Sequence, residues 1–104
     1  MPVPLLEWYK TIGVFIVNGY GMTENCCVCT NLDPFQPLGV GSVGKKSSPS
    51  VDLKITSEGE VCMTGPFLLD SYYKNEKMTR ETLIDGWLHT GDLGYIDDLS
   101  LIHI

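Results

Sequence analysis

Six consecutive residues near the amino end combine the groups that bind a nucleotide: Gly19-Tyr20-Gly21-Met22-Thr23-Glu24. The Tyr20 ring offers a flat surface for stacking on a base, and the Thr23 hydroxyl suits a phosphate oxygen. The Glu24 carboxylate is a hard oxygen ligand of the kind that Mg²⁺ prefers. Gly19 and Gly21 allow the backbone to turn sharply and to approach a ligand closely. The same residues also fit a glycine turn before a helix, with the Thr23 hydroxyl capping a free backbone N–H, and one short motif does not decide between the two.

The elements before this motif must position it. An apolar run at residues 14–17 predicts a buried strand that leads into the motif, and the segment after the motif can turn helical. A helix is predicted over residues 5–12, between a proline and a glycine. Leu5, Trp8 and Ile12 share one face of that helix, which we expect to pack on the strand. Because a lone buried strand leaves both edges unpaired, this α/β start indicates a fragment.

The composition indicates a folded chain of about one small domain, with 104 residues of which 43% are hydrophobic and 19% charged. The formal net charge of −6 argues against a surface for nucleic acid or for an anionic membrane. It does not exclude ATP, because backbone amides and a metal ion hold phosphates locally. No run approaches the roughly 20 apolar residues of a membrane span, and no secretory signal is present. We therefore expect a cytoplasmic protein.

The cysteines are expected to be buried free thiols of a reducing compartment. There are four of them: Cys26, Cys27, Cys29 and Cys62. Cys26 and Cys29 have the C-x-x-C spacing, but no second pair or histidine cluster completes a zinc site. His89 and His103 are too isolated in the sequence to suggest a metal.

A glycine-rich stretch at residues 39–45 imitates two phosphate-binding motifs. It contains a formal G-x-G-x-x-G, but residues 46–50 predict a loop where the dinucleotide fingerprint requires a helix. It is also close to a P-loop, but Lys46 stands where that motif needs Ser or Thr for Mg²⁺. A glycine-rich β-turn or hairpin is the better interpretation, after a loop at residues 31–38.

From about residue 39 onward the pattern predicts a small and mostly β structure. The expected elements, in chain order, are a hairpin of strands at 51–56 and 60–64, a helix at 75–84, and short strands at 87–90 and 93–96. The helix is expected to be capped by Asn75 or Thr79. Tyr72 and Tyr73 are expected to be partly buried.

A second motif, Asp85-Gly86-Trp87-Leu88-His89-Thr90-Gly91-Asp92, changes the interpretation of the first. Together the two resemble core motifs of the AMP-forming adenylating enzymes, a superfamily that contains acyl-CoA synthetases, luciferases and peptide-synthetase adenylation domains. The segments between them are similar in order and spacing, and the resemblance covers about Trp8 to Asp97. The continuation Glu24-Asn25-Cys26 is most similar to the long-chain fatty acid–CoA ligases.

The resemblance implies a fragment of the large N-terminal domain of such an enzyme. Residues 1–38 would end its α/β layer and residues 39–98 would form part of a distorted β-barrel subdomain. The family's phosphate loop, hinge and C-terminal domain, with the catalytic lysine, lie outside this sequence. Ser71 stands where the family has glycine. Residues 99–104 lack the expected glycine turn and the strand to a Gly-Arg pair, and we interpret them as a non-native tail.

The implied activity is that of an ATP-dependent acid–thiol ligase. Such an enzyme activates a fatty acid as its acyl-adenylate with Mg²⁺ and then transfers it to coenzyme A. The partners would be these small molecules and the missing parts of the same enzyme. We expect no nucleic acid and no transmembrane segment, and the full-length enzyme could still contact a membrane surface. The alternatives are a short-chain or aryl-acid ligase, or a stand-alone AMP-binding or interaction module. We expect the isolated chain to fold marginally and to lack ligase activity.

The resemblance also implies a role for each site residue. Tyr20 would stack on adenine, and Gly19 and Gly21 would let the backbone lie close to the nucleotide. Thr23 would contact the α-phosphate, and Glu24 would hold Mg²⁺. Asp92 would accept hydrogen bonds from the ribose hydroxyls. Trp87 is better interpreted as packing beneath the strand. His89 is expected to face solvent or a backbone partner.

Overall fold

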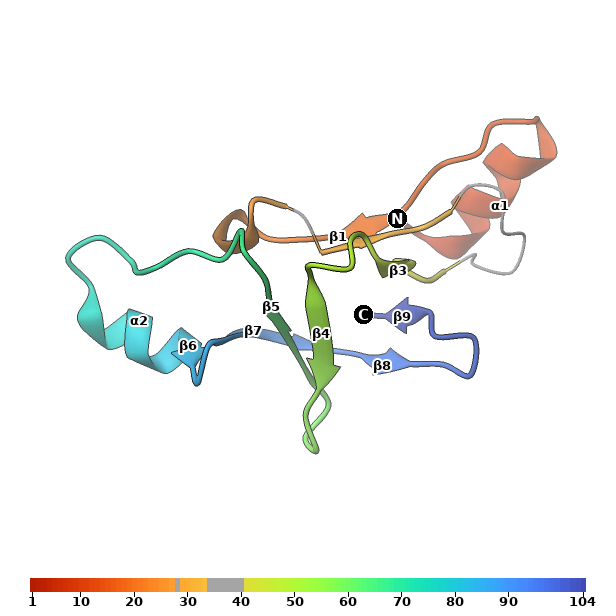
Figure 1. The fold of residues 1–104 in the computed structure, drawn as a ribbon. Helices are drawn as coiled ribbons and strands as arrows, with labels where there is room; N and C mark the ends of the chain where they lie inside the picture. Colours follow the sequence, from red (N-terminus) through yellow and green to blue (C-terminus); the bar gives the residue numbers. More distant parts are fainter. Residues whose placement is uncertain (28, 34–40) are drawn as a thin grey trace.

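A computed structural model describes residues 1–27, 29–33 and 41–104, so most of the loop predicted at 31–38 and the start of the glycine-rich stretch lie outside the described residues. The chain is mixed α/β with mostly strands in its second half, as the sequence predicted (Figure 1). The elements are α1 (Val3–Thr11), β1 (Gly19–Tyr20), the 3₁₀ helix η1 (Thr23–Asn25), β2 (Thr30–Asn31), β3 (Lys45–Lys46), β4 (Asp52–Ile55), β5 (Glu60–Thr64), α2 (Glu76–Thr82), β6 (Leu83–Ile84), β7 (Trp87–Leu93), β8 (Tyr95–Ile96) and β9 (Ile102–His103).

Three antiparallel sheets organise these elements. The first has the order β1-β2-β3, the second β4-β5-β7-β6, and the third pairs β8 with β9. The predicted hairpin at 51–64 is confirmed, with Leu53 opposite Met63 in the β4–β5 pair. The two helices lie at opposite ends of the molecule, and the second sheet runs between them (Figure 1).

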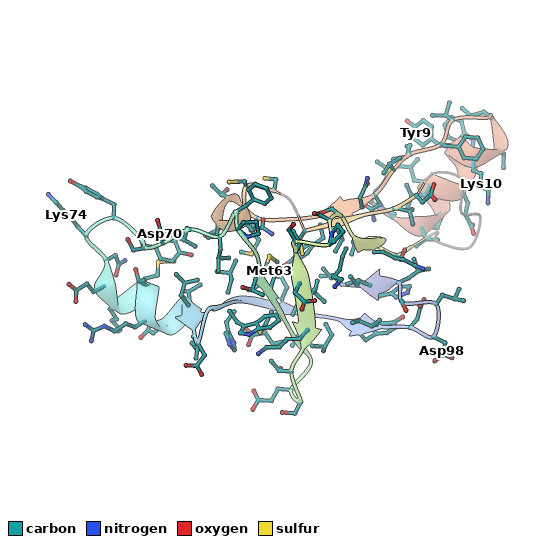
Figure 2. The ribbon with its side chains drawn as sticks, viewed as in Figure 1. Tyr9, Lys10, Met63, Asp70, Lys74 and Asp98 are labelled. Carbon is teal, nitrogen blue, oxygen red and sulfur yellow. The ribbon has the colours of Figure 1, made fainter. Side chains whose placement is uncertain are left out.

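The main core lies on one face of the second sheet. Its buried residues are Cys29, Val51, Met63 and Leu88. Met63 lies near the middle of the molecule, whereas Tyr9 and Lys74 lie toward its opposite ends (Figure 2). Half-buried side chains of the nucleotide motif, Tyr20 and Met22, pack against this core. The second sheet is therefore what positions the first motif.

The second helix and the strand after it differ in part from the prediction. Helix α2 is capped as expected, since the Met78 N–H donates to Asn75 Oδ1 at 3.1 Å. The helix ends at Thr82, however, and the next two residues form β6. Instead of two short strands around Gly91-Asp92, β7 runs without interruption to Leu93. Pairing with β5 keeps this strand extended, because the ladder continues to Leu93 opposite Glu60 across a local shift of register.

The amino-terminal prediction is wrong in its packing. Helix α1 exists but begins at Val3, and residues 14–17 form no strand. Leu5, Trp8 and Ile12 are 42%, 53% and 55% exposed, so the expected helix-on-strand contact is absent. The physical reason is that a strand needs a neighbouring strand, and among the described residues no strand pairs with 14–17, whereas the Val14 N–H donates to the Tyr9 carbonyl at 3.0 Å. The radius of gyration, 15.1 Å, accordingly exceeds the roughly 13 Å of a compact domain of this length.

The last residues are integrated into the structure. Leu101 and Ile102 are buried, and β9 pairs with β8. Ile102 also bridges to the first sheet region, because its N–H donates to the Gly44 carbonyl at 3.0 Å and its carbonyl accepts from Val43 at 2.8 Å. Both the assignment of 99–104 as non-native and the division between residues 38 and 39 stay predictions. Strand β3, on the far side of that division, completes the sheet of the first part.

Gly44 is a position where a side chain has no room. A Cβ atom there would fall on the Asn31 carbonyl group, and its φ of 87° is unfavourable for other residues. We expect Gly44→Ala to lower the free energy of unfolding by more than Gly86→Ala, measured by urea denaturation. Gly86 has a similar φ of 79° but open space around it, so its alanine variant isolates the backbone cost of about 1–2 kcal/mol. Equal costs for the two variants would contradict this account.

Asp97 links the last strand pair to acid stability. Its carboxylate contacts His103 Nε2 and accepts from the Leu101 and Leu99 N–H groups, each at 2.9 Å. The contact with His103 lowers the pKa of Asp97 most, and the two backbone N–H groups lower it further. Because the folded pKa lies below the unfolded one, the stabilisation is present at neutral pH and is lost as the pH falls through the folded pKa. We expect the melting temperature to fall as the pH drops below about 5, where the unfolded carboxyl with its pKa of about 3.9 begins to bind a proton, and we expect Asp97→Asn to reduce this dependence. An unchanged pH profile in Asp97→Asn would count against it.

Candidate nucleotide site

The structure brings together residues from the two sequence motifs. Tyr20 lies in β1 and Asp92 in β7, 72 residues apart, and the Tyr20 hydroxyl donates to Asp92 Oδ2 at 2.6 Å. Burial of the ring, followed by the bond to Asp92, raises the pKa of Tyr20. The hydroxyl therefore stays protonated and acts as the donor. This pair places a half-buried aromatic ring beside an exposed carboxylate, the two groups assigned to a nucleoside.

Thr30 holds the backbone of Tyr20, although the sequence gave no reason to select it. The Tyr20 N–H donates to Thr30 Oγ1 at 3.0 Å, and this hydroxyl donates in turn to the Val43 carbonyl at 2.7 Å. Thr30 is only 6% exposed, so its hydroxyl is held by these two partners away from water. One buried side chain thus ties β1 to the segment that leads into β3.

The two glycines of the first motif approach the protein's own backbone. A Cβ at Gly19 would lie 3.0 Å from the Thr30 carbonyl oxygen, and a Cβ at Gly21 would lie 2.6 Å from the Cys27 carbonyl carbon. Glycine is required at Gly21 for that reason alone. Closeness of these residues to a ligand stays a prediction.

The turn after Gly21 is organised by Asn25 rather than by Thr23. The Met22 N–H donates to Asn25 Oδ1 at 2.9 Å, and Asn25 Nδ2 contacts Met63 Sδ at 2.7 Å. Met22 occupies the N-cap position of η1, so the interpretation of Thr23 as the cap is wrong. The Thr23 side chain is instead exposed at the first position of η1. It remains accessible to a phosphate.

Glu24 is held by a residue from a distant loop. The Tyr72 hydroxyl donates to Glu24 Oε1 at 2.8 Å, and the Leu69 N–H donates to the Glu24 carbonyl at 2.8 Å. Burial, then the bond to Glu24, raises the pKa of Tyr72, which therefore remains a donor. The predicted partial burial is correct for Tyr72 and wrong for Tyr73, which is 87% exposed. The sequence predicted that Tyr72 is partly buried, but it did not predict the contact of Tyr72 with Glu24.

The irregular part of β7 that presents Asp92 is fixed by hydrogen bonds to β5. The Gly91 N–H donates to Glu60 Oε1 at 2.9 Å, and Gly91 has a φ of 76° that glycine adopts without strain. The Thr90 hydroxyl donates to the Val61 carbonyl at 2.7 Å and accepts from the Asp92 N–H at 3.1 Å. The Asp92 side chain is therefore exposed, whereas its backbone is held in place by these hydrogen bonds.

Two further residues of the second motif have partners. Lys54 Nζ lies 4.1 Å from the centre of the Trp87 ring, a cation–π contact, and the packing of Trp87 beneath the strand stays a prediction. The expectation that His89 faces solvent or backbone is wrong, because its Nδ1 lies 2.8 Å from Glu60 Oε2. The contact with His89 lowers the pKa of Glu60 most, and the hydrogen bond from the Gly91 N–H lowers it further. Isolation of a histidine along the sequence did not mean isolation in space.

The cysteine prediction holds for only half of the residues. All four are free thiols; Cys29 and Cys62 are buried, whereas Cys26 and Cys27 are exposed. Burial raises the pKa of Cys29 to about 11, so its thiol is protonated at neutral pH. In the part of the chain that the structure describes, no helix is both long and apolar enough to span a bilayer.

Comparison with known proteins identifies close similarity to CoA ligases. A 2-succinylbenzoate–CoA ligase from Bacillus cytotoxicus is 41% identical over 112 residues, which cover 99% of this chain and 23% of that protein. The o-succinylbenzoate CoA synthetase of Bacillus subtilis in complex with an acyl-adenylate matches with a TM-score of 0.89 at 34% identity, over 99% of this chain and 30% of that one. The same enzyme with ATP and magnesium matches with a TM-score of 0.85 at 34% identity, over 99% and 24%.

The N-terminal domain of FACL13 from Mycobacterium tuberculosis also matches, with a TM-score of 0.85 at 31% identity over 100% of this chain and 29% of that one. Curated relatives at 36% and 41% identity, however, are 2-succinylbenzoate–CoA ligases from Bacillus species. The similarity of residues 24–26 to long-chain fatty acid–CoA ligases is therefore not supported as a guide to the substrate. The chain spans about a quarter of the length of these curated relatives. The model of the AMP-binding enzyme family matches residues 1–73, more than half of the chain, and the chain belongs to that family.

Proposed function

We propose that this chain supplies the adenosine-binding part of the nucleotide site of an AMP-forming acid–thiol ligase that acts on an aryl acid. The hydrogen bond between Tyr20 and Asp92 carries the proposal, because it joins the two motifs at one place. A carboxylate offers two acceptor oxygens with about four lone-pair sites. Asp92 can therefore accept from two ribose hydroxyls while it keeps its bond to Tyr20. The Tyr20 ring supplies the stacking surface for the base.

The proposed reaction has two steps. The carboxylate of the acid attacks the α-phosphate of ATP, and pyrophosphate leaves. The thiol of coenzyme A then attacks the acyl carbon and gives up its proton to solvent, and AMP leaves with the electrons of the broken bond. Neither step needs a protein nucleophile, so catalysis rests on positioning and on charge neutralisation. In this chain, exposed Thr23 contributes a hydroxyl to the α-phosphate, next to Glu24.

The donor set at Glu24 fits Mg²⁺. Tyr72 occupies Glu24 Oε1, and the second carboxylate oxygen suits a hard cation that also binds substrate phosphates. When bound, Mg²⁺ neutralises charge on the phosphates. Tyr72 then acts on the carboxylate, holding its orientation from the loop before α2. A further ligand set within this chain is not required, because Mg²⁺ commonly keeps several waters.

The aryl-acid part of the proposal is supported by the relatives. The curated relatives act, by name, on 2-succinylbenzoate, and this chain is similar to them over nearly its whole length. The fatty acyl CoA synthetase of Mycobacterium tuberculosis matches at the lower identity of 31%. We therefore infer an aryl acid in preference to a long-chain fatty acid.

Two chimeric enzymes test the proposal. The 104 residues replace the matched segment of the Bacillus subtilis o-succinylbenzoate CoA synthetase and, separately, that of the Mycobacterium tuberculosis fatty acyl CoA synthetase. We expect the first chimera to keep ligase activity with 2-succinylbenzoate and to keep a larger fraction of its parent's activity than the second. A folded first chimera without AMP binding would contradict the nucleotide role. Equal or better retention in the second would contradict the aryl-acid assignment.

Tyr20→Phe tests the bond that joins the motifs. The variant keeps the stacking ring but removes the donor to Asp92, so we expect AMP affinity in the first chimera to fall by about 2- to 12-fold, the equivalent of about 0.5–1.5 kcal/mol. Isothermal titration calorimetry measures the change. Tyr95→Phe is the matched control, because Tyr95 is 60% exposed and stacks on His103. Equal effects of the two substitutions would remove Tyr20 from the site.

A further inference from the structure

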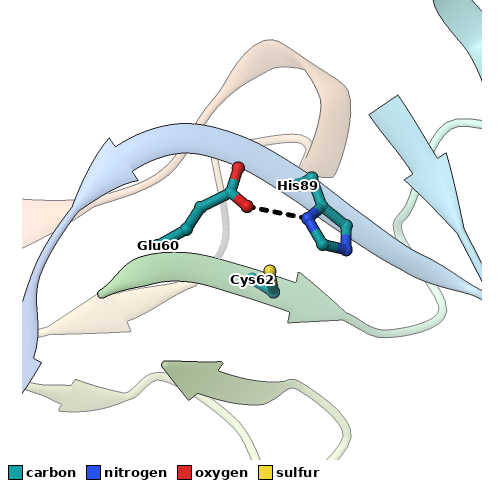
Figure 3. A group of neighbouring side chains, drawn as sticks. All are labelled: Glu60, Cys62 and His89. Atoms are coloured by element: carbon teal, nitrogen blue, oxygen red, sulfur yellow. Dashed lines mark hydrogen bonds and ion pairs between the residues drawn. The ribbon is translucent and has the colours of Figure 1, made fainter. Parts of the chain in front are cut away.

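Three side chains outside the nucleotide pair place metal-binding atoms close together. The Glu60 carboxylate, the Cys62 sulfur and a ring nitrogen of His89 all lie within 4.8 Å of one another. Glu60 and Cys62 are two residues apart in β5 and therefore share a face of the sheet. His89 stands directly opposite Cys62 in β7. The three side chains point toward one another across the two strands (Figure 3).

The kinds of donor atom select the class of ion. One thiolate sulfur, one imidazole nitrogen and one carboxylate oxygen are the ligands that Zn²⁺ and similar borderline divalent transition ions bind. Mg²⁺ and Ca²⁺ prefer oxygen alone and would leave the sulfur and the nitrogen unused. Three protein ligands leave one position of a tetrahedral ion for water. The set is thus distinct in chemistry from the carboxylate of Glu24.

Burial and orientation favour the same conclusion. Cys62 is fully buried, whereas the side chains of Glu60 and His89 are 26% and 24% exposed, so the group is open to solvent on one side. The Gly91 N–H already holds Glu60 Oε1 at 2.9 Å, which is the kind of outer hydrogen bond that orients a metal-binding carboxylate. The ion would replace the 2.8 Å contact between His89 Nδ1 and Glu60 Oε2.

We propose that Glu60, Cys62 and His89 form a binding site for a divalent transition ion of the Zn²⁺ class. Binding releases the thiol proton of Cys62 to solvent, and the ion takes the sulfur as thiolate. The simpler arrangement on the same residues is a Glu60–His89 ion pair above a buried, unreactive thiol. In the proposed site the Cys62 sulfur binds an ion, whereas in the simpler arrangement it binds none. Spectroscopy can measure this difference.

Titration of the reduced 104-residue chain with Co²⁺ tests the site, because Co²⁺ reports tetrahedral geometry and sulfur ligation through its visible and near-ultraviolet absorption. We expect a thiolate-to-cobalt band with one equivalent of Co²⁺, and its loss when Zn²⁺ is added, since Zn²⁺ binds more tightly. We expect Cys62→Ser and His89→Gln each to weaken Co²⁺ binding by about 10-fold or more. Circular dichroism of each variant checks that the fold is kept.

Exposed cysteines provide the matched controls. Cys26→Ser and Cys27→Ser should leave the spectrum unchanged, because both thiols lie outside the three-residue group. A band that persists in Cys62→Ser, or one that disappears in Cys26→Ser or Cys27→Ser, overturns the proposal. The absence of any thiolate band in the unaltered chain, once circular dichroism has shown that this chain is folded, overturns it as well. If Cys62→Ser does not fold, Glu60→Gln decides, since the amide keeps an acceptor for Gly91 but loses the charge that the ion needs.

Discussion

We expect the replacement of Asp92 with alanine to lower the affinity for AMP by about 5- to 150-fold, the equivalent of about 1–3 kcal/mol. In the proposed site, the substitution would leave two ribose hydroxyls without their acceptor, and it also removes the partner of the Tyr20 hydroxyl. Because Asp92 is exposed, the loss should appear in binding and not in the free energy of unfolding. Calorimetric titration of AMP into the Bacillus subtilis chimera, with and without the substitution, measures the change.

A neighbouring acid controls for the lost charge. Asp98 is also exposed, and Asp98→Ala removes the same charge without touching the Tyr20–Asp92 pair. If the two alanine variants bind AMP equally well, Asp92 is not part of the site. A double variant adds a further check, because Tyr20→Phe and Asp92→Ala act on one hydrogen bond and should therefore be less than additive.

Replacing Leu88 with alanine destabilises the fold by about 2–5 kcal/mol, as expected for a truncated core leucine. Leu88 is fully buried in β7 and packs with Val51, Met63 and Cys29. The total stability of a domain is commonly only about 5–15 kcal/mol, so this single change removes a large part of it. Urea denaturation followed by circular dichroism measures the difference in the free energy of unfolding.

The control lies on the same strand. Leu93 is 68% exposed, and Leu93→Ala should change stability by no more than about 0.5 kcal/mol. Similar losses for the two variants would mean that the core does not lie where the structure places it. Since Tyr20 packs against the same core, Leu88→Ala should also weaken AMP binding, whereas Asp92→Ala should leave stability unchanged.

Elements that depend on local signals could be predicted from the sequence. The hairpin of β4 and β5 follows from alternating residues such as Leu53 and Ile55 around a short turn with Gly59. The start of α2 follows from Asn75, whose side chain caps the helix by itself. In contrast, the strand expected at 14–17 depends on partners elsewhere, and an apolar run cannot supply them.

The candidate site shows the same limit. Tyr20 and Asp92 were each identified from a motif, but no local pattern predicts a contact between residues 72 apart. The same holds for Tyr72 beside Glu24, which lies 48 residues away, and for Glu60 beside His89. Residue types predicted which groups could act on a nucleotide. The three-dimensional packing decides which of them meet, because Tyr20 and Asp92 lie in different sheets and only Glu60 and His89 lie on paired strands.

The bridge between Gly44 and Ile102 has a consequence for how the chain folds. It joins residues that are 58 positions apart (102 minus 44), and it fixes Val43 and Gly44 to the last strand pair. The contact between Tyr20 and Asp92 joins residues that are 72 positions apart. Contacts that span most of a chain form slowly, because the intervening loop must close first. We therefore expect the local β4–β5 hairpin to form before Tyr20 and Asp92 meet.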